Sequence, residues 1–172
     1  MARIIVADAG PLIAFAGVGQ LELLRILFGE VVIPQSVKDE CLAKPGEDAA
    51  LIKQAITQGW LAVQQRPAQP KTLSPVLGPG ESDAIRIGQE DPQNTLLIMD
   101  DRLARRYALK RGLPLIGTTR LLDIAEQRGL LGSAEDCIQA MAERGYRIST
   151  ALLDRIRQHR KGNPYIFGEI IS

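Results

Sequence analysis

Residues 95–105 of the chain read TLLIMDDRLAR, an uncharged run that ends in two acids and continues into a basic segment. Short apolar runs of this kind are typical of strands covered on both faces, as in a parallel sheet. The basic segment extends to Arg111 and stops at Gly112, which predicts a helix over residues 102–111. The stretch therefore indicates a buried strand whose carboxyl end carries Asp100 and Asp101 and leads directly into a helix.

The same alternation recurs along the chain. Four more runs predict strands, at residues 3–7, 30–33, 61–63 and 113–116. Helices are expected between them, at 12–15, 21–28, 35–43, 49–58, from 80 onward and at 118–127, with a turn at 8–11 and a long loop at 65–80. This order predicts an α/β fold with a parallel central sheet over residues 1–130. Helices at 133–143 and 150–161 predict an α-helical C-terminal extension, residues 131–172.

The composition excludes several classes of protein. Among 172 residues, 21 are basic and 20 acidic, and 45% are hydrophobic, which argues against a disordered chain and a strongly basic nucleic-acid arm. The chain has one histidine and two distant cysteines, so a zinc site, a disulfide framework and histidine-based catalysis are disfavoured. No segment has the pattern of a membrane span or a signal peptide, and we expect a cytoplasmic protein without membrane contact.

Acidic residues stand where parallel sheets bind ligands. Asp8 directly follows the first predicted strand, as Asp100 and Asp101 follow the fourth, and ligands of open parallel sheets bind outside the carboxyl ends of the strands. Three more acids lie on predicted helices that can face the same crevice: Glu40, Glu81 and Asp83. Taken singly, each acid could instead cap a helix, form a turn or pair with an arginine.

Several carboxylates in one crevice repel one another unless a cation neutralises them. Mg²⁺ or Mn²⁺ suits such a site because both ions prefer oxygen ligands. Bound ions of this kind can generate hydroxide and stabilise the oxygens of an in-line phosphodiester attack. The acids therefore favour metal-assisted hydrolysis as the chemistry of the site.

The order of motifs resembles the PIN-domain ribonucleases, especially the DUF3368-type group of the VapC toxin-like branch. The resemblance covers about residues 3–157 and is carried by six stretches, VADAGPLI at 6–13, VIPQSVKDE at 32–40, GESDAI at 80–85, LIMDDRLAR at 97–105, GLPLIGT at 112–118 and GYRIS at 145–149.

The resemblance implies a three-layer α/β/α sandwich and an acidic site that binds Mg²⁺ or Mn²⁺ for RNA cleavage. Asp8 and Glu40 would be the first two acids, and Asp101 would complete the metal site. The third acid is Glu81 or Asp83, and the fourth is Asp100 or Asp101. Typical members carry Ser or Thr where this chain has Met99, and Thr118 could supply a hydroxyl nearby.

We expect the basic helix to contact RNA through Arg102, Arg105 and Arg106. The leading hypothesis is a metal-dependent endoribonuclease, and the family suggests a toxin paired with a small antitoxin and a homodimer. The alternative is a catalytically weak or inactive PIN-like module that binds nucleic acid or protein, motivated by Met99 and the ambiguous third acid.

Overall fold

The computed structural model describes residues 3–65, 73–146, 154 and 157–158. It divides into two compact units, Met1–Thr118 and Thr119–Ser172. The helix expected at 150–161 falls almost wholly outside the described residues. The domain boundary expected at residue 130 stays a prediction.

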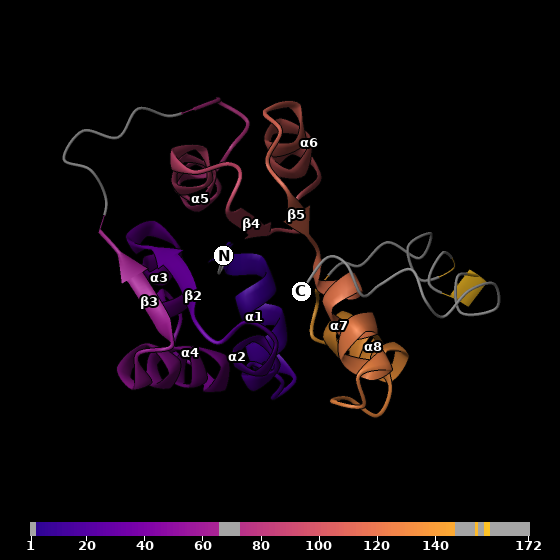
Figure 1. Cartoon of the computed structure of the whole chain (residues 1–172). Helices are drawn as coiled ribbons and strands as arrows, with labels where there is room; N and C mark the ends of the chain where they lie inside the picture. The colour runs from indigo at the N-terminus through magenta and orange to yellow at the C-terminus, as the bar shows by residue number, and fades with distance from the viewer. Residues whose placement is uncertain (1–2, 66–72, 147–153, 155–156, 159–172) are drawn as a thin grey trace. The chain divides into compact units, whose positions relative to one another are not determined.

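The first unit is built on a five-stranded sheet in which every pairing is parallel; strands β2 to β5 are labelled in Figure 1. Its strands are β1 (Ile4–Ala7), β2 (Val31–Pro34), β3 (Leu61–Gln64), β4 (Thr95–Ile98) and β5 (Leu115–Ile116), in the order β3-β2-β1-β4-β5. All five predicted strands are confirmed. Strand β1 lies between β2, which follows it in sequence, and β4, which comes later in the chain. The carboxyl ends of β1 and β4 therefore meet where the strand order reverses, the usual ligand position of such sheets.

Helices connect the strands, as the sequence predicts. In the first unit they are α1 (Ala9–Gly17), α2 (Glu22–Phe28), α3 (Gln35–Leu42), α4 (Glu47–Gln58), α5 (Pro79–Glu90) and α6 (Arg102–Lys110). Helices α7 (Thr118–Gln127) and α8 (Ala134–Glu143) follow, and Ser133 caps α8 by accepting a hydrogen bond from the backbone N–H of Asp136.

The turn expected at residues 8–11 is wrong, because these residues begin α1. Asp8 is the N-cap of this helix, and Pro11 lies in its first turn. Proline fits there because the first backbone N–H groups of a helix have no partner within the helix. The strand therefore passes into a helix without an intervening turn, with Asp8 at the junction.

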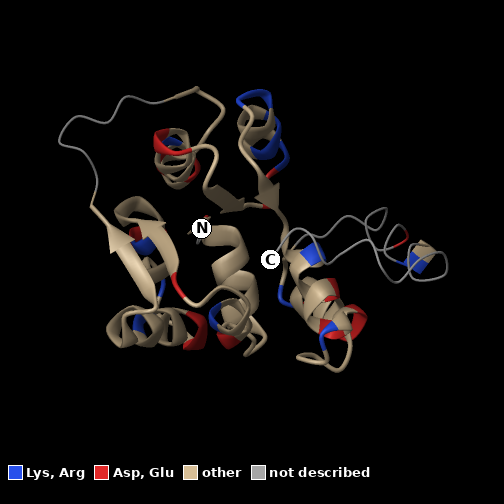
Figure 2. Ribbon diagram, viewed as in Figure 1, with Lys and Arg blue, Asp and Glu red and all other residues tan. Residues whose placement is uncertain are grey.

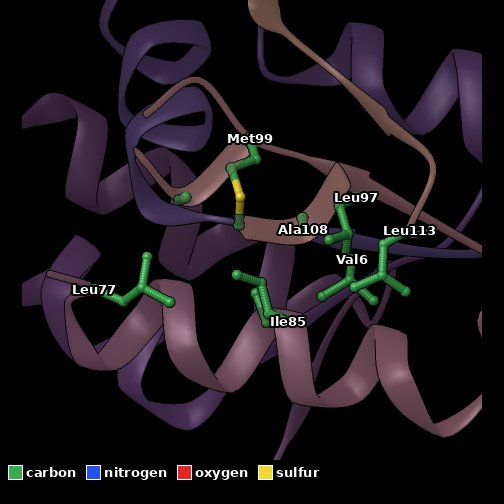
Figure 3. Packing of buried hydrophobic residues seen from close by; sticks show 9 residues of the cluster. Val6, Leu77, Ile85, Leu97, Met99, Ala108 and Leu113 are labelled. Atoms are coloured by element: carbon green, nitrogen blue, oxygen red, sulfur yellow. The ribbon is translucent and has the colours of Figure 1, made fainter. Parts of the chain in front are cut away.

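Both faces of the central strands are buried, which confirms the three-layer α/β/α arrangement. On one face, Val6 of β1 and Leu97 of β4 pack with Ile85 of α5 and Ala108 of α6 (Figure 3). Neighbouring side chains that point the other way, such as Leu96 and Ile98, are buried as well. Strands buried on both faces explain why their sequences read as continuous apolar runs.

Met99 belongs to this core and not to the polar end of the strand. Its side chain is fully buried in the same cluster, among Leu77, Ile85 and Leu113 (Figure 3). We expect Met99→Ala to lower the free energy of unfolding by about 2–5 kcal/mol, because the lost methylene and sulfur contacts leave a cavity. Leu109→Ala, on a side chain that is 58% exposed, should change it little. Chemical denaturation of both variants would check this, and equal effects would contradict the burial of Met99.

No single helix among the described residues is long and apolar enough to cross a membrane. Helices α1 and α2 have the length and apolar composition of a membrane span only when they are taken together, and the chain is bent between them.

Candidate functional site

Three helices of the first unit begin with a carboxylate bound to a backbone N–H. Asp8 Oδ1 accepts a hydrogen bond from Ala9 N at 2.8 Å at the start of α1. Glu81 Oε2 accepts from Gly78 N at 2.8 Å at the start of α5, and Asp101 Oδ1 accepts from Ala104 N at 2.9 Å at the start of α6. These bonds fix the orientation of each carboxylate at the N-terminus of its helix.

The acids lie close enough to influence one another's protonation. The pKa of Asp8 is raised to about 7, mainly by burial and additionally by the charges of Glu81, Glu40 and Asp100, while the hydrogen bond from the Ala9 N–H lowers it. Burial likewise raises the pKa of Glu81, with Asp101 and Glu40 adding to the effect. Asp8, Glu40, Glu81, Asp100 and Asp101 therefore influence one another electrostatically near the carboxyl ends of β1 and β4, and we call them the acidic cluster. Their joint role in binding a metal stays a prediction.

Gly80 lies beside two of these acids, Asp8 and Glu40. A Cβ built on Gly80 would lie 3.3 Å from Glu40 Oε2 and 3.4 Å from Asp8 Oδ1, and 3.1 Å from a methyl of the buried Val37. The absence of a side chain on α5 at this point lets the carboxylates of β1 and α3 come together. Asp8 and Glu40, which are distant in sequence, are thus neighbours in the fold.

Asp83 takes a different position from Glu81. It is buried, and its Oδ2 accepts a hydrogen bond of 2.6 Å from the hydroxyl of Ser36 on α3. The same hydroxyl also lies 3.5 Å from the carbonyl oxygen of Pro79. Ser36 therefore ties the first turn of α5 to α3, the helix that carries Glu40.

We expect Ser36→Ala to lower the free energy of unfolding by about 1–3 kcal/mol, because it removes a donor from a buried carboxylate. Urea denaturation of the wild type and the variant would measure the difference. A variant as stable as the wild type would show that this bond contributes nothing to the joining of α3 and α5.

Asp100 and Asp101 also differ, although they are adjacent. Asp100 Oδ1 accepts from Thr118 N at 2.8 Å, and its Oδ2 accepts from Thr118 Oγ1 at 2.5 Å. Asp101 is exposed and caps α6. The hydroxyl expected of Thr118 is thus present, but it is engaged with Asp100, and Met99 brings no polar group to the site.

Arg105 lies against this pair rather than in solvent. Its Nη1 donates to the carbonyl oxygen of Met99 at 3.0 Å. A Cβ on Gly117 would lie 2.6 Å from that nitrogen and 2.9 Å from Asp100 Oδ1, so a side chain there would require these groups to shift. The guanidinium contacts the end of β4, and of the three arginines expected to contact RNA, Arg102 and Arg106 are exposed and Arg105 is half-buried.

The donors in the cluster are chemically suited to a hard divalent ion. They are all carboxylates, and the space above Gly80 sits between two of them. Within the described residues, however, no three acidic, cysteine or histidine side chains are already drawn together as a metal site.

A family model described as PIN domain, DUF3368, matches residues 4–161. The chain belongs to the PIN-domain family. PIN domains are generally a nuclease fold, typically hydrolases that use divalent metal ions. This confirms the family expected from the six sequence stretches.

Among solved structures, this PIN domain is similar to a PilT N-terminus domain protein from the hyperthermophilic archaeon Sulfolobus solfataricus P2. The TM-score is 0.50 and the identity 20%, over 69% of this chain and 90% of the other, so the likeness concerns the fold alone. A comparison with curated proteins found no match.

Three residues of this PIN domain were missed by the sequence interpretation: Gly80, Gly117 and Ser36. The two glycines lie next to predicted acids or hydroxyls, but a sequence does not reveal that a Cβ there would meet a carboxylate. Ser36 lies one helical turn before Glu40 on α3, a spacing that places both on one face and that could have indicated it.

Proposed function

We propose that this protein is a metal-dependent endoribonuclease that hydrolyses phosphodiester bonds of RNA. The observation that carries the proposal is the meeting of Asp8 and Glu40 across Gly80, beside Glu81 and Asp101. A protein has little reason to gather carboxylates around a buried Asp8 unless a cation joins them, because their repulsion costs stability.

In this proposal Asp8, Glu40 and Asp101 hold Mg²⁺ or Mn²⁺, and Glu81 helps to position the site. When bound, such an ion would supply Lewis acidity and a nucleophile for hydrolysis of the phosphodiester. The N-termini of α1 and α6 orient Asp8 and Asp101, and Gly80 leaves the space between Asp8 and Glu40. Asp100 serves through its bonds to Thr118, and Asp83 through its bond to Ser36, as residues that position the elements around the site.

A cleavage assay tests the proposal. The purified protein should cut single-stranded RNA with Mn²⁺ or Mg²⁺ and lose this activity in EDTA. Asp101→Asn should reduce the rate on the order of 100-fold or more, as removal of a directly acting group does. Cleavage that persists in EDTA, or an unchanged rate in Asp101→Asn, would exclude this assignment.

A second candidate, a PIN-like binding module without catalytic activity, is favoured by one observation. Met99 is buried in the core and leaves no hydroxyl at the position where typical members carry one. RNA binding that is unaffected by EDTA, without cleavage under any divalent ion, would support this candidate. A cytoplasmic location, a toxin role, a homodimer and a small antitoxin partner stay predictions.

A further inference from the structure

Helix α6 concentrates positive charge next to the acidic cluster. It starts directly after Asp101, and residues 102–111 contain four arginines and one lysine but no acid (Figure 2). These five side chains fall into two groups: some bind to other parts of the protein, and the others are exposed without such contacts.

Two of the five cations are held by the protein itself. Arg105 donates to the carbonyl oxygen of Met99 and lies against Gly117. The guanidinium of Arg111 lies 3.4 Å from the centre of the Tyr107 ring, and its Nη1 donates to the Tyr107 carbonyl oxygen at 3.4 Å. Both charges are therefore partly used in local contacts.

The other three, Arg102, Arg106 and Lys110, are exposed and make no recorded ion pair or hydrogen bond with the rest of the described chain. They are four residues apart, so they follow one ridge of the helix. Each step rises about 6 Å along the axis, which is similar to the separation of successive phosphates in an extended single strand. The ridge begins beside Asp101 and leads away from the acids.

We propose that the ridge of Arg102, Arg106 and Lys110 binds successive phosphates of a single RNA strand and leads that strand to the acidic cluster. The inference rests on the proposed function, which it refines by naming the side of the site from which the substrate is held. A single line of charges matches one backbone, whereas a duplex presents two. Arg105, expected from the sequence to contact RNA, is replaced in this role by Lys110.

Fluorescence anisotropy of a labelled single-stranded oligouridylate, measured in EDTA over a range of salt concentrations, tests the proposal without cleavage. Each phosphate contact with a single strand contributes about 0.7 to the slope of log K against log salt. The triple variant Arg102→Ala/Arg106→Ala/Lys110→Ala should lower the slope by about 2 and weaken binding about 100-fold at 0.1 M salt. Arg106→Ala alone should lower the slope by about 0.7.

Lys53→Ala is the matched control, because Lys53 is an exposed lysine on α4, which lies at the other end of the first unit from α6 (Figure 1). It should leave the slope unchanged. A triple variant with the wild-type slope, equally tight binding of a duplex, or equally effective competition by polyglutamate would overturn the proposal. Binding that follows the expected slopes in a protein that never cleaves RNA would uphold the ridge and reject the nuclease.

Discussion

Asp8→Asn is expected to slow RNA cleavage strongly while making the metal-free protein more stable at pH 8. The amide keeps an oxygen that can accept the hydrogen bond from Ala9 N, so the cap of α1 is preserved. It removes the charge that Glu40 needs beside it to hold a cation. We expect the cleavage rate to fall on the order of 100-fold or more, and Mn²⁺ binding measured by calorimetry to weaken in parallel.

The gain in stability follows from the pKa of Asp8, which burial raises from 3.8 to about 7. Between these values the folded protein holds a proton that the unfolded chain releases, so stability falls as the pH rises from about 4 to about 7. Three pKa units correspond to about 4 kcal/mol. Asparagine never ionises, so the variant should lack this loss and exceed the wild type in stability only above about pH 5.

Thermal unfolding in EDTA at pH 5 and pH 8 would measure this effect. Asp136→Asn provides a control, because Asp136 is an exposed acid on α8. It should change neither the pH dependence nor the cleavage rate. An Asp8→Asn protein that loses stability between pH 5 and pH 8 as steeply as the wild type would show that another group is responsible.

Addition of Mn²⁺ to the wild type should raise its unfolding temperature more at pH 8 than at pH 5. A ligand that binds only the folded state stabilises it by mass action, and at pH 5 protons compete for Asp8. Equal shifts at both values would place the bound ion away from Asp8.

The sheet could be predicted from the sequence because each strand is buried on both faces and therefore appears as a continuous apolar run. The same reasoning indicated the positions of Asp8 and Asp101, because an acid that follows a buried strand lies at the carboxyl edge of the sheet. The partition of the remaining acids could not be predicted. It depends on Ser36 facing Asp83 and on Thr118 reaching Asp100, contacts between residues 47 and 18 positions apart.

Met99 departs from the Ser or Thr of typical members, and the structure shows that its side chain is part of the core. Its position in the chain matches that of a polar residue in typical members, but its side chain fills the core between β4 and α5. A sequence cannot reveal whether a residue at a strand end turns toward the core or toward the site. Packing against Leu77 and Ile85 determines this here.

Gly80→Ala is expected to weaken Mn²⁺ binding and cleavage by at least about tenfold while the protein stays folded. The new methyl would lie 3.3 Å from Glu40 Oε2 and 3.4 Å from Asp8 Oδ1, and Val37 on its third side is fully buried and leaves it little room to move. The crowding costs about 1–3 kcal/mol. Replacing a helical glycine by alanine returns up to about 1 kcal/mol, so the free energy of unfolding should fall by no more than about 3 kcal/mol.

Gly88→Ala on the same helix separates these two effects. Its new methyl would meet only Leu97 and Leu113, at 3.2 and 3.5 Å, and no carboxylate. This variant has the same gain in helix preference and a comparable steric cost, so its free energy of unfolding should be close to that of Gly80→Ala. Its Mn²⁺ affinity and cleavage rate should stay at the wild-type level. If both variants bind Mn²⁺ as the wild type does, the ion does not lie between Asp8 and Glu40. If both lose binding equally, the effect comes from a displacement of α5 as a whole and not from the space above Gly80.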